Sequence, residues 1–255
     1  MIAQFALRLM FGMSAMWSLM PRHQVSVGFF RIQMLIVMGL SVLATLTFGE
    51  LSHAPETSTI LPISWGTPLC IALGVLAFFG SAFWTIDFRR VGTVIVFAIM
   101  ILSGGLLVGS TLTSWSSWPS WLAALGEIST ALSLGGAMTG MLLGHWYLTA
   151  PTKSISPLNT LNRLFGLSVG SRLIVSAIAL ASGWAMLQSE THWLWLSLRW
   201  LAGIIGPLIL VVMVSRILRY KNTQSATGVL FVGVILTFIG ELSATLLTRE
   251  LHLPF

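Results

Sequence analysis

The 255-residue sequence contains very little charge. Asp, Glu, Lys and Arg together make up 8% of the residues, whereas hydrophobic residues make up 56% and the mean hydropathy is +0.91. Soluble domains usually carry about 25% charged residues, which cover the surface that faces water. The shortage of charge therefore excludes a water-soluble protein and indicates a protein that folds in a membrane.

Cysteine is almost absent as well. Cys70 is the only cysteine and lies in an apolar run, so the chain can form no intramolecular disulfide, thiolate metal cluster or Cys-ligated iron–sulfur centre. The sequence also lacks a Gly-rich phosphate-binding loop, an HExxH zinc motif and a Ser/His/Asp order typical of a hydrolase. We expect no metal site in this chain, and any metal or redox centre should belong to a partner subunit.

Apolar runs of about 20 residues, the length needed to cross a bilayer, recur along the whole sequence. We expect an all-α polytopic membrane protein with eight spans in one domain, residues 1–255. The expected spans are about 2–20, 26–48, 66–86, 91–113, 120–148, 166–187, 194–217 and 226–248. Connectors 49–65 and 149–165 are the longest, and we expect the second of them to be an ordered loop.

Lysine and arginine predict the orientation of the spans. They lie in or beside the first, third, fifth and seventh connectors and are missing from the second, fourth and sixth. Because cytoplasmic loops carry the excess of Lys and Arg, both chain ends are expected on the outer, periplasmic side of a bacterial inner membrane. This distribution explains the net charge of +6 without nucleic acid. The expected partners are lipids and protein subunits.

Four ionisable residues, Arg8, Glu127, Arg199 and Glu241, lie inside apolar runs. At about 1.5 Å per residue, each lies roughly 10 Å below the outer end of its span. Charges are costly in hydrocarbon, so two acids and two bases at one depth indicate a site. We expect them to meet in one layer if their helices are neighbours.

Two interpretations of this predicted layer remain open. In one, each arginine pairs with a glutamate only to fix the packing register of the helices. In the other, the layer lines a cavity open to the outer surface and handles protons or a polar headgroup, because burial and a neighbouring arginine both shift carboxyl titration. Glu50 and His53, at the outer end of the second span, would continue that route to water. His192, in an outer connector, is a further candidate.

A second set of polar residues is expected in the inner half of the membrane. Arg31 and Arg172 lie about six residues from the cytoplasmic face, within reach of the headgroups, so we expect structural roles for both. His145 is the only histidine within a span and could bind a haem b together with another ligand. A two-haem cytochrome b is disfavoured, because it needs histidines that face each other inside the membrane.

Two glycine patterns predict how the helices pack. Gly136, Gly140 and Gly144, with Gly135 adjacent, place bare backbone on one side of the fifth span, where a neighbouring helix can approach closely. The Gly206-Pro207 pair should interrupt the seventh span near mid-membrane, because proline removes a backbone hydrogen bond.

The chain resembles the membrane-anchor subunits of molybdopterin and iron–sulfur oxidoreductases, namely the DMSO reductase anchor and the NrfD-type anchors. The likeness consists of eight spans, both ends outside, no cofactor ligand set, and Gly240-Glu241-Leu242 near the outer end of the last span, similar to a Gly-Glu element late in those anchors. In those anchors an arginine often follows the glutamate sooner than Arg249 does here.

The resemblance implies a quinone-reactive anchor subunit that exchanges electrons with an iron–sulfur or haem subunit docked outside. The implied site residues are Glu127 and Glu241 for proton handling, and Arg8, Arg199, Glu50 and His53 for a quinone pocket. Two other functions remain open. One is a secondary transporter or channel, which would use the buried charges and the Gly206-Pro207 break. The other is a structural or assembly subunit of a respiratory or photosynthetic complex.

Overall fold

The computed structural model describes residues 2–49, 63–111, 120–149, 154–184 and 187–251. The described residues form helices and no strands, which confirms the all-α class. The elements are α1 Ile2–Leu19, η1 Arg22–Gln24, α2 Val27–Thr47, α3 Ile63–Thr85, α4 Arg89–Thr111, α5 Ser120–Thr149, α6 Ser156–Gly183, α7 Glu190–Trp200, η4 Leu201–Ile205, α8 Gly206–Arg219 and α9 Thr223–Leu251.

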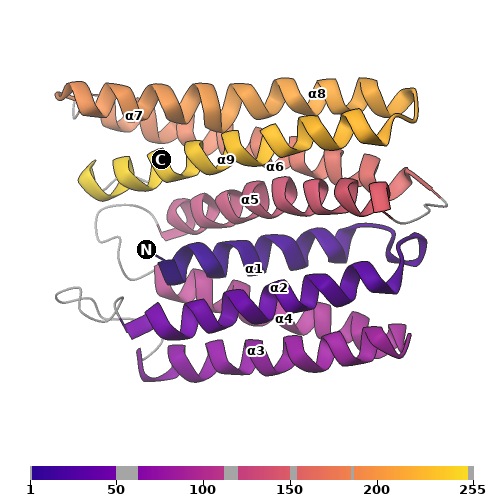
Figure 1. Cartoon of the computed structure of the whole chain (residues 1–255). Helices are drawn as coiled ribbons and strands as arrows, with labels where there is room; N and C mark the ends of the chain where they lie inside the picture. Colours follow the sequence, from indigo (N-terminus) through magenta and orange to yellow (C-terminus); the bar gives the residue numbers. More distant parts are fainter. Residues whose placement is uncertain (1, 50–62, 112–119, 150–153, 185–186, 252–255) are drawn as a thin grey trace.

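The long helices lie side by side in one bundle, and α1 begins at the end where α9 finishes (Figure 1). This end is named the terminal end. The opposite end is named the basic end, because η1 with Arg22, the first turn of α4 with Arg89, and the last turn of α8 with Arg219 lie there. Successive long helices therefore alternate in direction, as expected for short connectors between spans.

Within the described residues, seven helices are long and apolar enough to cross a membrane, with α7, η4 and α8 forming one continuous helix. They are Ile2–Leu19, Val27–Thr47, Trp65–Thr85, Arg89–Ser110, Ser156–Gly183, Glu190–Arg219 and Thr223–Leu251. Helix α5 has 30 residues but is not in this set, because its glutamate, glycines, serines and threonines lower its hydropathy. Most of its described side chains are buried against other helices rather than exposed, so the eighth span stays a prediction.

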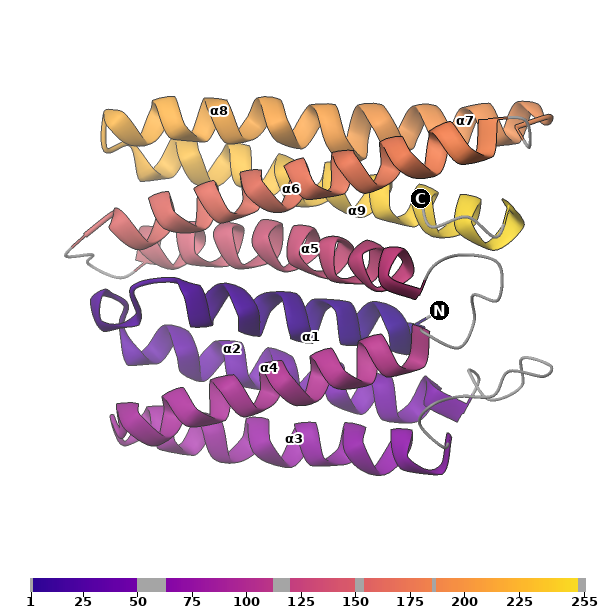
Figure 2. The ribbon, with the colours of Figure 1, turned by 180° about the vertical axis from the view of Figure 1, so that it is seen from behind.

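The long helices of the described residues form two rings of four, with α7–η4–α8 counted as one helix. In the first, α1 packs against α2 and α4, and α3 packs against both of these. In the second, α5 packs against α6 and α9, and the α7–η4–α8 helix packs against both of these. The rings are joined mainly by α1 and α5, which lie in the middle of the bundle (Figures 1 and 2). The first helix of each ring is therefore the one that holds the two halves together.

Bare backbone allows α1 and α5 to touch. A Cβ atom added to Gly12 would overlap the carbonyl group of Ala131, and one added to Gly135 would overlap the backbone of Gly12. The remaining glycines of the predicted α5 ridge face other helices, since Gly136 lies against Phe165 of α6 and Gly144 lies against α9. The ridge therefore serves three neighbouring helices, with the closest backbone contact at Gly135.

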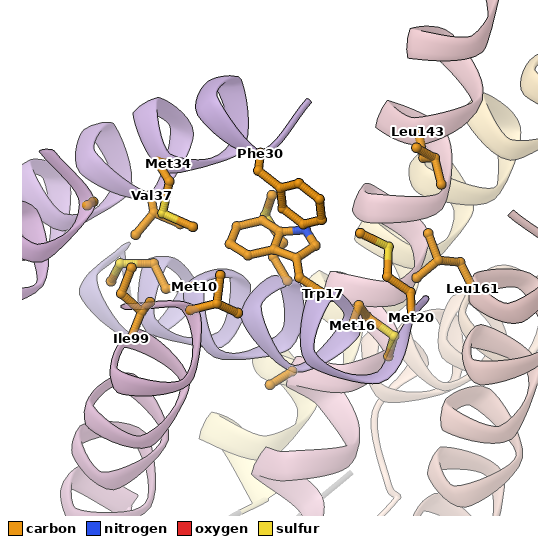
Figure 3. Packing of buried hydrophobic residues seen from close by; sticks show 14 of the residues in the cluster. Met10, Met16, Trp17, Met20, Phe30, Met34, Val37, Ile99, Leu143 and Leu161 are labelled. Atoms are coloured by element: carbon orange, nitrogen blue, oxygen red, sulfur yellow. The ribbon is translucent and has the colours of Figure 1, made fainter. Parts of the chain in front are cut away.

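Methionines fill the core around α1. Met10, Met13, Met16 and Met20 recur every three or four residues along this helix and are all buried. Figure 3 shows several of them beside Trp17, whose ring lies next to Phe30. Unbranched methionine side chains adapt to irregular gaps between helices, so α1 packs closely against α2, α4 and α5.

Helix α6 begins ten residues earlier than expected, at Ser156 instead of about 166. The loop predicted for 149–165 is therefore wrong over most of its length. Pro157 occupies the first turn of the helix, where its missing N–H group costs nothing and its fixed φ angle is already helical. As a result, Arg172 lies closer to Gly183, at the terminal end of α6, than to Ser156.

The predicted break at Gly206-Pro207 takes the form of a π-helical turn over Leu201–Ile205. The ring of Pro207 would collide with the carbonyl group four residues earlier, that of Gly203, in a regular α-helix. The wider π turn removes this conflict while the chain continues as α8.

The α1–α5 contact predicts different outcomes for two glycine substitutions. Gly135→Ala should lower the free energy of unfolding by about 1–3 kcal/mol, because its methyl group would overlap the Gly12 backbone. Gly105→Ala on α4, where a Cβ has no neighbour within 4 Å, should be neutral or slightly stabilising. SDS-induced unfolding followed by tryptophan fluorescence measures both, and equal effects would contradict the described contact.

Candidate functional site

Arg8 of α1 and Glu127 of α5 form an ion pair across the junction of the two rings. The Arg8 Nε atom donates to Glu127 Oε2 at 2.7 Å, and Nη2 donates to Oε1 at 2.5 Å. This two-pronged geometry is the strongest that an arginine and a carboxylate can adopt. The side chains are only 10% and 9% exposed. The two hydrogen bonds of the pair therefore replace the water contacts that both charged groups lose on burial.

Two neutral side chains extend this pair. The Gln4 amide donates to Glu127 Oε1 at 3.1 Å, and Arg8 Nη1 donates to the Thr245 hydroxyl of α9 at 3.3 Å. Thr245 donates in turn to the backbone carbonyl of Glu241 at 2.8 Å. One hydroxyl group therefore connects the Arg8–Glu127 pair to the helix turn that carries the second buried glutamate.

Glu241 lies between two arginines. Arg172 of α6 donates through Nε to Oε1 and through Nη2 to Oε2, both at 3.2 Å. Arg199 of α7 donates through Nη1 to Oε1 at 2.8 Å, and its other nitrogens reach the Ser176 hydroxyl at 3.0 and 3.3 Å. Arg199 is fully buried, and the Arg172 and Glu241 side chains are 3% and 4% exposed. These contacts hold three helices in one register.

Small residues allow the charged side chains to meet. Gly240, directly before Glu241, packs against the backbone of Gly203. A Cβ atom added to Gly240 would overlap the Gly203 backbone, and one added to Gly203 would lie only 2.9 Å from the Gly240 Cα atom. Gly203 lies one turn after Arg199 and belongs to the π turn, and a Cβ there would also lie 2.9 Å from Arg199 Nη1. Glycine at these two positions is therefore a condition for the Arg199–Glu241 ion pair.

The first junction repeats this arrangement. Gly12 lies one turn after Arg8, Ala131 lies one turn after Glu127, and the backbones touch at these two residues. In both places a close crossing of helices lies next to an ion pair. The short crossing distance allows the charged side chains to bond directly, without a bridging ligand.

The five ionisable side chains are named the charge layer: Arg8, Glu127, Arg172, Arg199 and Glu241. The four residues expected to meet do so, in two groups joined through Thr245. Chemically, the layer sets strong N–H donors beside carboxylate acceptors in an apolar surrounding. Such a set can hold a carbonyl or hydroxyl oxygen and can pass protons.

Arg172 belongs to the charge layer and not to the headgroup region. The expected position near the cytoplasmic face is wrong, because it depended on a sixth span that began at 166. With α6 starting at Ser156, the apolar spacing of Leu158, Leu161 and Phe165 continues the helix toward the basic end. The apolar spacing and the proline in the first helical turn are the sequence signals for a helix that starts at Ser156, and this start places Arg172 deep in the bundle. Arg31 is exposed.

Of the remaining predicted site residues, His145 and His192 lie outside the charge layer. Glu50 and His53 fall outside the described residues. His145 is exposed near the basic end of α5, with its ring edge-on to Phe231 at 6.2 Å between centroids, and a haem b there stays a prediction. His192 lies in the first turn of α7 and is 7% exposed, with Nε2 3.2 Å from Glu250 Oε1.

Among the described ranges, no three His, Cys, Asp or Glu side chains gather closely enough to hold a metal ion. No protein-family model, curated protein or solved structure matches the chain.

Removing one arginine tests whether Arg172 belongs to the charge layer. Arg172→Gln should lower the free energy of unfolding by about 3 kcal/mol, because Glu241 loses two hydrogen bonds within a buried ion pair. The matched control is Arg31→Gln, which removes an exposed guanidinium group and should change stability by less than about 0.5 kcal/mol. SDS-induced unfolding gives both values. Similar small losses would return Arg172 to the headgroup role.

Proposed function

We propose that this chain is a membrane subunit of an oxidoreductase complex, and that its charge layer binds a quinone and exchanges protons with it. The observation that carries the proposal is the arrangement of three arginines and two glutamates in one buried layer. A quinone oxygen accepts hydrogen bonds, which arginine N–H groups supply, and quinone reduction consumes protons, which carboxylates can relay. The layer offers both kinds of group within one set of contacts.

We further infer that the protein crosses a bacterial inner membrane eight times, α5 included, with the terminal end outside. Two features support this orientation. Lys and Arg gather at the basic end, as the cytoplasmic side requires. Trp121 and Trp193 are 61% and 42% exposed near the terminal end, where indole rings favour a membrane interface. In this orientation the charge layer lies in the outer half of the membrane.

The electrons would come from, or pass to, an iron–sulfur or haem subunit docked at the terminal end. This partner is proposed because the charge layer is nearer that end, so a quinone bound there lies closest to a subunit outside the membrane. The proposal agrees with the resemblance to the eight-span anchors. In particular, the Gly240-Glu241 element that carries this likeness lies at the contact with Arg199.

Neutralising Glu241 tests the proposal. In the complex purified from its native host by a tag on this chain, Glu241→Gln should lower quinone-linked turnover about 100-fold or more, because a proton relay contributes on that scale. The matched control is Asp87→Asn, which neutralises an acid in an exposed ion pair with Arg89 at the basic end and should leave turnover unchanged.

Assembly must be measured alongside turnover, since Glu241 also holds three helices together. The variant complex should still copurify with its cofactor-bearing partner, and extraction should recover quinone from the unmodified complex. Normal turnover in an assembled Glu241→Gln complex would overturn the proton role. A tagged chain that brings down no redox partner and no quinone would overturn the function as a whole.

A structural role is the second candidate, and one observation favours it. Each carboxylate oxygen of Glu127 and Glu241 already accepts a hydrogen bond from arginine. Replacing Arg8 and Glu127 together, by Arg8→Met with Glu127→Met, removes a buried pair without leaving one charge alone, a change that often preserves stability. We expect this double variant to assemble but to lose quinone-linked turnover. Full turnover would support the purely structural role.

A further inference from the structure

The charge layer is sealed on one side and approaches the protein surface on the other. Arg172, Arg199 and Glu241 are 3%, 0% and 3% exposed. By contrast, Gln4 and Thr245, which bond to the other ion pair, are both half-buried. A ligand that reaches the charge layer through the described part of the chain therefore meets Arg8 first.

This more open side lies where α1 faces α9. The Phe5 and Phe238 rings meet there edge to face, with centroids 5.4 Å apart at an angle of 77°, and Arg8 reaches across to Thr245. The backbones of α1 and α9 do not approach each other as α1 and α5 do. The α1–α9 seam is defined as Gln4, Phe5, Arg8, Phe238 and Thr245.

The seam faces the membrane. On α9, Phe238, Leu242 and Thr245 share one side of the helix, because they are spaced by four and three residues. Leu242, between the other two, is 57% exposed. An apolar side chain so exposed within the last third of a spanning helix indicates contact with lipid. The seam is therefore bordered by the hydrocarbon in which a quinone dissolves.

We propose that the quinone headgroup reaches the charge layer sideways from the membrane through the α1–α9 seam, with its ring against Phe5 and Phe238 and one carbonyl oxygen on Arg8 Nη1. This inference rests on the proposed function and names the part of the site that the headgroup occupies. Phe5 and Phe238 present ring faces and edges suited to a flat conjugated ring. The quinone's apolar tail remains in the lipid beside Leu242.

The hydrogen bonds at the seam allow a quinone oxygen to replace Thr245 as the acceptor from Arg8. Arg8 Nη1 donates to Thr245 at 3.3 Å, long for a hydrogen bond, whereas its bonds to Glu127 are 2.5 and 2.7 Å. The Thr245 hydroxyl keeps its own bond to the Glu241 carbonyl group when Arg8 turns to a ligand. A quinone oxygen can therefore take the place of Thr245 without leaving a buried group unbonded, while Glu127 still holds Arg8.

Photolabelling tests the seam directly. The purified complex, in lipid nanodiscs, is irradiated with an azidobenzoquinone that carries an isoprenoid tail, and the labelled peptides are identified by mass spectrometry. We expect labels within 2–9 of α1 and 238–245 of α9, suppressed by excess ubiquinone or menaquinone. In Phe5→Leu with Phe238→Leu, the probe concentration for half-maximal labelling should rise at least about tenfold, consistent with the loss of two aromatic contacts.

The matched control is the Phe78–Phe79 pair on α3, which has a similar edge-to-face geometry at 5.7 Å and 73° but lies on the exposed surface. Phe78→Leu with Phe79→Leu should leave labelling unchanged. Competed labelling on other helices would overturn the seam and leave quinone binding intact. No competed labelling anywhere, in a complex that also contains no extractable quinone, would overturn the proposed function and the seam together.

Discussion

The rest of the structure depends on the cost of placing an ionised side chain among apolar helices. Arg199 has no exposed surface, so its charge has to be balanced from within the protein. Glu241 and Ser176 do this, and they come from two other helices. Because breaking such a pair leaves an uncompensated buried charge, α6, α7 and α9 can pack in only one register. Arg8 and Glu127 impose the same condition on α1 and α5, and therefore on the two rings.

This electrostatic condition also determines where the backbones must be bare. A guanidinium group bonds directly to a carboxylate on a neighbouring helix only if the helix axes cross closely, and the bundle crosses most closely at glycine. Gly12 follows Arg8 by one turn, Gly203 follows Arg199 by one turn, and Gly240 precedes Glu241. The π turn Leu201–Ile205 belongs to the same arrangement, because it begins two residues after Arg199 and contains Gly203, the glycine that packs against Gly240. Charge pairing and close packing are thus two parts of one arrangement.

The sequence alone predicted the all-α class, most helix bounds to within a few residues, and four members of the charge layer. It could do so because charge in an apolar run is rare, and depth follows from a constant rise per residue. It missed Arg172, because prolines and asparagines between 149 and 165 made a helix start look like a loop. The sequence could not predict which arginine pairs with which glutamate. Depth gives the level of a residue along the bundle, but it does not give the side of the helix on which the residue lies or which helices are neighbours.

The distribution of hydrogen bonds within the charge layer bears on the choice between a register mark and a site. A pure register mark needs each charge to be paired and sealed, as Glu241 is between Arg172 and Arg199. The Arg8 side differs, because it adds a neutral amide, a long bond to a hydroxyl and an aromatic contact between two half-buried rings. None of these is required to neutralise Arg8, which Glu127 already does through two bonds. The sealed half can therefore hold the helices and keep the Glu241 carboxylate in place for proton exchange, while the Arg8 half remains able to exchange a hydrogen-bond partner, as the proposed quinone site requires.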